Sequence, residues 1–253
     1  PFAGGVINLP AVTIGLLMTV LLIIGTRTSA TINAVLATFK VVALVLFIAL
    51  SLPVLHAGNF QAFSPNGIFG EVSGMGIAGA AASIFFAYIG LDAVSTPAEE
   101  TRNPQRNMPI GVIGSLLVCT VFYLLVSAGA VGAVGAQTVI NASTGAAFEP
   151  GSAELMAACG LPATAGALAC SPEPLAHVIS QLGWRTASQF IGLAAFLAMP
   201  AVVLMMLFGQ TRIFFAMARD RLLPFNESLT RLHPRFNTPY VVTLITGLAV
   251  TAL

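Results

Sequence analysis

The chain has 253 residues, of which 57% are hydrophobic and 8% are charged, with ten basic and nine acidic side chains and a formal net charge of +1. Soluble domains carry about 25% charged residues, so this chain cannot cover a water-exposed surface, and its mean hydropathy of +0.93 predicts an integral membrane protein. The basic residues are scattered between apolar runs and form no patch, so we expect no nucleic-acid partner. Three cysteines are too few for a disulfide scaffold.

The apolar runs, taken in chain order, predict a helical membrane bundle. A bilayer core about 30 Å thick needs about 20 residues of helix. Five runs approach or exceed that length and a sixth begins, at about 9–25, 32–55, 72–96, 110–136, 187–218 and 240–253. None alternates with the period of a barrel strand, so the predicted class is all-α, a polytopic bundle in a single membrane domain. The first residue is Pro1 and the last run stops at Leu253, so we expect this domain to be truncated at both ends.

Arginines set the orientation of the predicted bundle. The loops after the first, third and fifth spans hold Arg27, Arg102, Arg106, Arg219, Arg221, Arg231 and Arg235. The only arginine in the intervening loops is Arg185. Because positive residues favour the cytoplasmic side, we expect those three basic loops in the cytoplasm and Pro1 outside.

Two predicted loops contain further features. The external loop, 137–186, holds Cys159 and Cys170, which form a disulfide if the compartment is oxidising and are free thiols otherwise. On the cytoplasmic side, the stretch 220–238 mixes leucines with charges, so we expect a short amphipathic helix along the membrane surface.

Lys40 is the only lysine of the chain and lies inside the second predicted span, about eight residues from its cytoplasmic end. That is roughly 12 Å of helix, about twice the reach of a lysine stem, so snorkelling alone leaves the ammonium within the membrane. Desolvation favours the uncharged amine, so the group can take up and release a proton. The alternative is a snorkelling lysine on a span that begins deeper, and the cost of a mid-span charge favours the functional role.

Asp92 is the acidic residue of the third predicted span. Gly90, Asp92 and Pro97 weaken the helix there, and a broken helix exposes backbone carbonyls that bind ions or ammonium groups. An unbroken helix with Asp92 near its cytoplasmic end fits the pattern equally well. No nucleophile–base pair or metal-ligand spacing accompanies these residues, so we expect no enzyme activity, no cofactor and no metal.

Three stretches of the sequence resemble a known family. They are FFAYIGLDAVSTPAEETRNPQRNMPIGVIGSL (Phe85–Leu116), GQTRIFFAMARDRLLP (Gly209–Pro224) and HPRFNTPYVVTLITG (His233–Gly247). The first resembles the sixth-helix region of amino acid permeases of the amino acid–polyamine–organocation superfamily, with the cationic amino acid transporter branch as the best match. The other two resemble the eighth helix, its following loop and the ninth helix of that family. The resemblance implies a fragment covering helices four to nine of a transporter with an inverted-repeat, five-plus-five helix fold.

The resemblance also implies roles for particular residues. The family's sixth helix is unwound where this chain has Phe86, Ala87, Tyr88, Ile89 and Gly90, and the carbonyls of Phe86, Ala87 and Ile89 are then expected to receive the substrate's α-ammonium.

Ion coupling is implied at other positions. Lys40 falls where proton-coupled members carry a fifth-helix lysine, and Asp92 matches a sixth-helix acid associated with substrate or proton coupling. Pro200 and Ala201 replace hydroxyl residues that often serve sodium, which favours H+ as the coupling ion. A loop glycine of the family is Arg221 here.

These observations predict secondary active transport of amino acids, by proton-coupled symport with alternating access. The alternatives are a passive facilitator for amino acids or polyamines without ion coupling, and a non-transporting membrane receptor or subunit. The expected partners are an amino acid, cationic or neutral, and the lipid bilayer, and the expected location is the plasma membrane.

Overall fold

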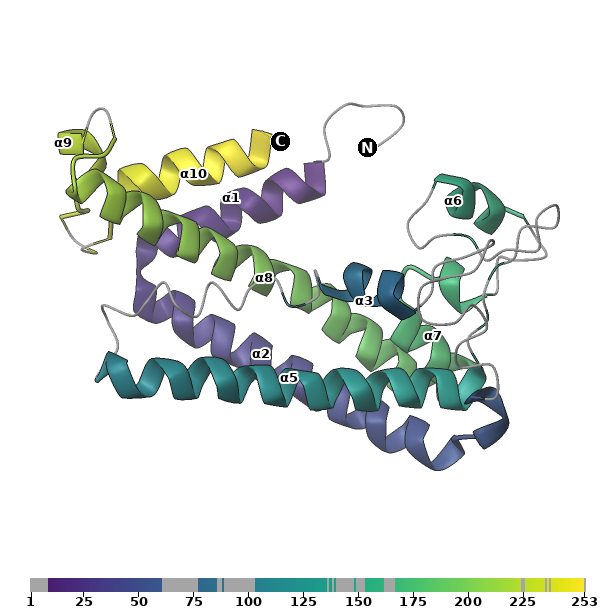
Figure 1. The fold of residues 1–253 in the computed structure, drawn as a ribbon. Coiled ribbons are helices and arrows are strands. Elements are labelled where there is room, and N and C mark those ends of the chain that lie inside the picture. Colours follow the sequence, from purple (N-terminus) through teal and green to yellow (C-terminus); the bar gives the residue numbers. More distant parts are fainter. Residues whose placement is uncertain are drawn as a thin grey trace. The chain divides into compact units, whose positions relative to one another are not determined.

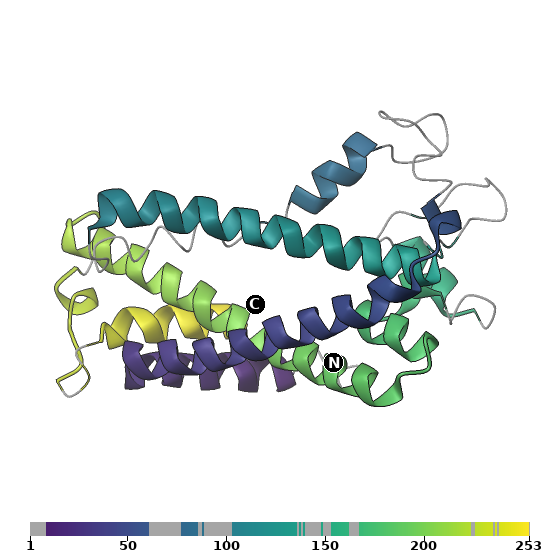
Figure 2. The same cartoon turned by 90° about the horizontal axis from the view of Figure 1, so that it is seen from below.

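The computed structural model (Figures 1 and 2) describes residues 9–60, 77–85, 88, 103–135, 137, 139, 148, 153–161, 167–223, 226–234, 236 and 238–252. Every regular element within these ranges is helical, which confirms the predicted all-α class. The α-helices are α1 Leu9–Ile24, α2 Thr26–Ser51, α3 Ile77–Phe85, α5 Pro104–Val134, α6 Ala153–Cys159, α7 Pro174–Gln181, α8 Arg185–Arg219, α9 Asn226–Leu229 and α10 Tyr240–Ala252. Short 3-10 helices are η2 Leu52–Val54, η3 Ala57–Phe60 and η6 Leu168–Cys170.

Within the described part of the chain, three helical stretches are long and apolar enough to cross a membrane, namely Thr31–Val54, α5 and α8, and α1 and α10 are shorter apolar helices. Helix α8 has 35 residues, about 52 Å at 1.5 Å per residue. Since a bilayer with its headgroups is about 40–45 Å thick, we expect Arg185 and Arg219, at the two ends of α8, to lie at or beyond the headgroups.

The third predicted span coincides with only one described helix, α3, followed by Tyr88 in a 3-10 turn. The other residues of that span, Asp92 included, lie outside the described residues. The broken helix expected there therefore stays a prediction.

The chain divides into two compact units, which share the helices α2, α5 and α8. Unit 1 comprises Pro1–Lys40, Gly90–Ser115 and Phe196–Leu253, and unit 2 comprises Val41–Ile89 and Leu116–Ala195. Each unit has its own apolar core, so each is described separately.

In unit 1, α1 and α10 pack side by side (Figures 1 and 2). The close approach depends on two glycines, because Gly15 of α1 lies against Thr251 and Gly247 of α10 lies against Thr19, and neither site has room for a Cβ atom. A core of Met18, Leu22, Leu204 and Leu207 joins α1 to the second half of α8. The Thr238 hydroxyl, just before α10, donates a hydrogen bond of 2.8 Å to the carbonyl of Ile23 and so ties the loop to the end of α1.

In unit 2, Phe47 of α2 is completely buried beside Val178 and Ile179 of α7 and Ile191 of α8. Helix α5 packs against the end of α2 and the following 3-10 helices, since Gly132 accepts hydrogen bonds from the His56 N–H at 2.9 Å and from Asn59 Nδ2 at 2.8 Å. These contacts hold the start of the predicted external loop 137–186 close to the end of α2.

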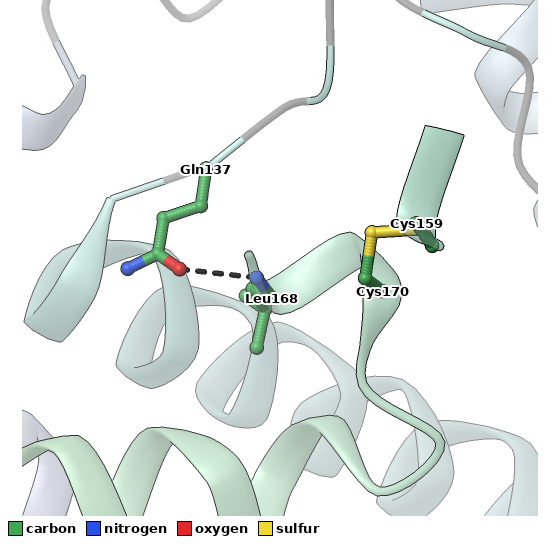
Figure 3. The surroundings of a disulfide bond; sticks show 4 residues. All are labelled: Gln137, Cys159, Leu168 and Cys170. Carbon is green, nitrogen blue, oxygen red and sulfur yellow. Dashed lines mark hydrogen bonds between the residues drawn. A yellow bond between two sulfur atoms is a disulfide. The ribbon is translucent and has the colours of Figure 1, made fainter. Parts of the chain in front are cut away.

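That external segment contains regular structure, namely α6, η6 and α7. A disulfide joins Cys159 to Cys170, which decides between the two alternatives left open by the sequence, and Gln137 Oε1 accepts a hydrogen bond of 3.0 Å from the Leu168 N–H (Figure 3). The hydroxyl of Ser188 donates to the carbonyl of Ala176 at 2.7 Å and joins α7 to α8.

The prediction of an amphipathic helix over 220–238 was wrong for the described part of that stretch, which contains only the single turn α9. Pro224 and Pro234 interrupt the stretch, and proline removes a backbone donor and clashes with the preceding turn of a helix. The leucine of α9, Leu229, instead lies against α10, where it lines a pocket with Val242 and Ile245.

Candidate functional site

Tyr88 is the one residue of the predicted substrate-binding segment that the structure describes, and α5 holds it in place. Its hydroxyl lies 3.2 Å from Thr120 Oγ1, and its ring meets that of Tyr123 edge to face with centroids 5.3 Å apart. The Thr120 hydroxyl already donates to the carbonyl of Leu116 at 2.8 Å. Either hydroxyl can donate in the contact between Tyr88 and Thr120, and Tyr88 is the donor when the single Thr120 proton goes to Leu116.

Thr120 and Tyr123 are contact residues of Tyr88 that the sequence did not predict. They lie three residues apart, so they share one face of α5, where the rest of the helix is mostly apolar. A polar residue and an aromatic residue at this spacing in an apolar helix are the signal that could have revealed a partner for Tyr88.

The rest of the predicted segment, Phe86, Ala87, Ile89 and Gly90, lies outside the described residues, as does Asp92. The structure therefore brings Tyr88 together with α5 but does not test the role of the backbone carbonyls or of the Asp92 carboxylate.

Lys40 lies on the more buried face of α2. It is half-buried, whereas Val41 and Val42 beside it are 47% and 51% exposed. Ala43 and Phe47, three and seven residues further along the same face, are 5% and 0% exposed. None of the described acidic residues forms an ion pair with Lys40. The amine is thus carried by the packed side of an apolar helix and not by its exposed side.

Three residues of α8 bear on the predicted ion coupling and its surroundings. The guanidinium of Arg212 lies over the Phe208 ring at 5.0 Å from the centroid, which is cation–π geometry. Helix α8 continues through Pro200 as one element, and Ala201 is 1% exposed, so the positions where the family often carries hydroxyls present a ring and a methyl group here.

Comparisons with known proteins show which family the chain resembles. The family model described as "Amino acid permease" matches residues 7–253. The chain is 37% identical over 240 residues to the branched-chain amino acid permease BcaP of Bacillus subtilis strain 168, covering 95% of this chain and 44% of that protein. It is 32% identical over 251 residues to the methylthioribose transporter of the same strain, covering 99% of this chain and 46% of that protein.

A plant protein is a more distant relative. The chain is 31% identical over 233 residues to the chloroplastic cationic amino acid transporter 9 of Arabidopsis thaliana, covering 91% of this chain and 34% of that protein. The chain therefore spans less than half the length of these curated relatives.

Proposed function

This chain belongs to the amino acid permease family, and on that premise we propose that the full-length protein accumulates amino acids across a membrane by proton-coupled secondary transport. Its relatives are named as permeases and transporters and not as enzymes, and its long apolar helices make it a multi-pass membrane protein. In the proposed cycle, the site opens outward, an amino acid and a proton enter, and the protein then opens inward.

Lys40 carries the proposal of proton coupling. A lone amine on the packed face of an apolar helix costs several kcal/mol in its charged form, and no described acid neutralises it. Protonation and deprotonation of Lys40 therefore change the free energy of its surroundings, and a conformational cycle that exposes it alternately to the two sides moves one proton.

Tyr88 supports the proposed place of substrate binding. Its hydrogen bond to Thr120 and its ring contact with Tyr123 fix one point of the segment to α5. In the proposal, the carbonyls of Phe86, Ala87 and Ile89 accept hydrogen bonds from the substrate's ammonium, which brings donors and no acceptor. Asp92 is proposed to take part in proton coupling.

The substrate is proposed to be a neutral, branched-chain amino acid. The described helices contain no aspartate or glutamate in α1, α2, α5, α8 or α10, whereas a buried cationic side chain needs an opposite charge. A relative with 37% identity is named a branched-chain amino acid permease, and the cationic transporters match at lower identity. The proposed location is the plasma membrane.

The test is uptake of labelled leucine by the full-length protein in proteoliposomes. With one proton per substrate, a pH difference of one unit is equivalent to about 1.4 kcal/mol and drives about tenfold accumulation. Lys40→Ala is expected to abolish the response to the gradient. Lys40→Arg keeps the charge but cannot release the proton at neutral pH, so it is expected to fail in the same way.

Three controls make the result decisive. A protonophore removes the gradient and should remove the accumulation. Excess unlabelled valine should compete with leucine, and excess arginine should not. Leucine accumulation that does not depend on the pH gradient and persists in Lys40→Ala would refute proton coupling. Equilibration of leucine without accumulation would indicate a passive facilitator.

A further inference from the structure

A pocket lies in unit 1 where α1, α2 and α8 meet. Its volume is about 190 Å³, and its lining includes Leu22 of α1, Ser29 and Asn33 of α2, and Met205 and Phe208 of α8. Among the lining residues that the structure describes, Ser29 and Asn33 are the polar ones, and none of those residues is ionisable. Since a water molecule occupies about 30 Å³ of liquid, the pocket has room for several waters.

The two polar residues differ in the hydrogen bonds that they already make. The Ser29 hydroxyl lies 3.0 Å from the carbonyl oxygens of both Leu21 and Gly25. These two carbonyls share its single proton, so the hydroxyl can only accept hydrogen bonds from water. The Asn33 side chain is half-buried, and it makes no hydrogen bond with any other described residue. Its amide therefore has both donors and acceptors to offer within the pocket.

Helix geometry places this pocket beneath Lys40. Asn33 and Lys40 are seven residues apart, so they lie on the same face of α2 about 10.5 Å apart along the axis. A helical side chain leans toward the N-terminus of its helix, which is the direction from Lys40 to Asn33. A lysine stem covers about 6 Å of this distance, so one water spans the remaining gap between the ammonium and the amide.

We propose that Asn33, with Ser29 behind it, holds the water through which Lys40 exchanges its proton with the cytoplasmic side. This inference rests on the proposed function, in which Lys40 gains and loses a proton, and on the orientation that places the start of α2 in the cytoplasm. The proton passes from the Lys40 ammonium to the water beside Asn33 and then to water beside Ser29. Asn33 gains and loses no proton, so it is a positioning residue.

Accessibility of position 40 tests the path without relying on transport. Lys40→Cys is made in the full-length protein without other reactive thiols, which includes Cys119→Ser because Cys119 is exposed. A water-soluble thiol reagent is then applied from the cytoplasmic side. Adding Asn33→Leu is expected to slow labelling at least fivefold, because the leucine fills the pocket with apolar groups. Adding Asn33→Ser, which retains a polar group, is expected to slow labelling less than twofold.

The matched control is Thr38→Val on the same helix. Thr38 is exposed, and its hydroxyl donates to the carbonyl of Ala34 at 2.9 Å, so its loss removes a polar group away from the pocket. Labelling of Lys40→Cys should be unchanged by Thr38→Val. With Lys40 intact, Asn33→Leu should reduce gradient-driven leucine uptake at least tenfold while leucine exchange at equal pH stays within twofold of wild type.

The outcomes separate the two proposals. Labelling that Asn33→Leu leaves unchanged, or that Thr38→Val slows equally, overturns the path at Asn33. Uptake and exchange that fall together in Asn33→Leu also overturn it, because the residue then serves folding or substrate binding. Wild-type uptake that ignores the pH gradient overturns the proposed function, and the labelling result still decides whether water reaches position 40 past Asn33.

Discussion

Arg221 lies in a backbone conformation that favours glycine, and we expect Arg221→Gly to stabilise the end of α8. Its φ is 60°. The Leu222 N–H bonds to the Met217 carbonyl at 3.0 Å, and the Arg221 N–H bonds to the Ala218 carbonyl at 3.1 Å. This pair of bonds is the Schellman motif, in which the residue after the helix is left-handed and is usually glycine.

The chain contains a matched example at the end of α7. The Trp184 N–H bonds to the Ile179 carbonyl at 3.2 Å, the Gly183 N–H bonds to the Ser180 carbonyl at 3.0 Å, and Gly183 has a φ of 87°. A Cβ atom at Gly183 would meet nothing within 4 Å. The effect of a substitution there is therefore conformational and does not involve packing.

Two opposing free-energy terms set the size of the expected stabilisation by Arg221→Gly. The left-handed conformation costs a residue other than glycine about 1–2 kcal/mol, and glycine loses an additional 0.5–1 kcal/mol of entropy, roughly, on folding. Arg221→Gly should then stabilise the end of α8 by about 0.5–1 kcal/mol, which slows local hydrogen exchange about two- to fivefold. Gly183→Ala should speed exchange at the end of α7 by a similar factor.

Hydrogen exchange followed by mass spectrometry on the full-length protein measures both effects, after correction for intrinsic exchange rates. Arg219→Gly is the control, because Arg219 is the last helical residue of α8 and glycine there costs up to about 1 kcal/mol. The reasoning is refuted if Arg221→Gly speeds exchange at residues 217–222 or behaves like Arg219→Gly.

Three further predictions concern stability. Cys170→Ser opens the disulfide to Cys159 across a sequence separation of 11, which should lower local stability by about 3 kcal/mol and raise hydrogen exchange in α6 and η6. Gly247→Ala places a Cβ atom against α1 and should lower the thermal midpoint through about 1–3 kcal/mol of overpacking, whereas Gly111→Ala meets nothing within 4 Å and should raise it slightly. Tyr88→Phe loses a hydrogen bond, which should cost about 0.5–1.5 kcal/mol in a double-mutant cycle with Thr120→Val.

Each of these has a contradicting result. Unchanged exchange after Cys170→Ser would show that the disulfide does not hold the external segment. If Gly247→Ala and Gly111→Ala had the same thermal midpoint, α1 and α10 would not pack as closely as the structure shows. A coupling energy of zero would show that Tyr88 and Thr120 do not bond in the membrane.

The candidate site was only partly predictable. The mid-span position of Lys40 was visible in the sequence because a single lysine interrupts a long apolar run. The partners of Tyr88 were not, since Thr120 is 32 residues away and only the packing of its segment on α5 brings the two hydroxyls together. The prolines of 220–238 outweighed the amphipathic pattern from which a helix was expected.

The sequence by itself determined that this is a helical membrane protein with one lysine inside a long apolar run. The bilayer imposes that result, because backbone groups in lipid must be satisfied within each segment and apolar length alone then identifies the helices. The tertiary structure decided which helices meet closely, which cysteines join and which residues line a pocket with Asn33. These depend on contacts between residues far apart in the chain, and hydrophobicity, being non-directional, does not specify which pairs form.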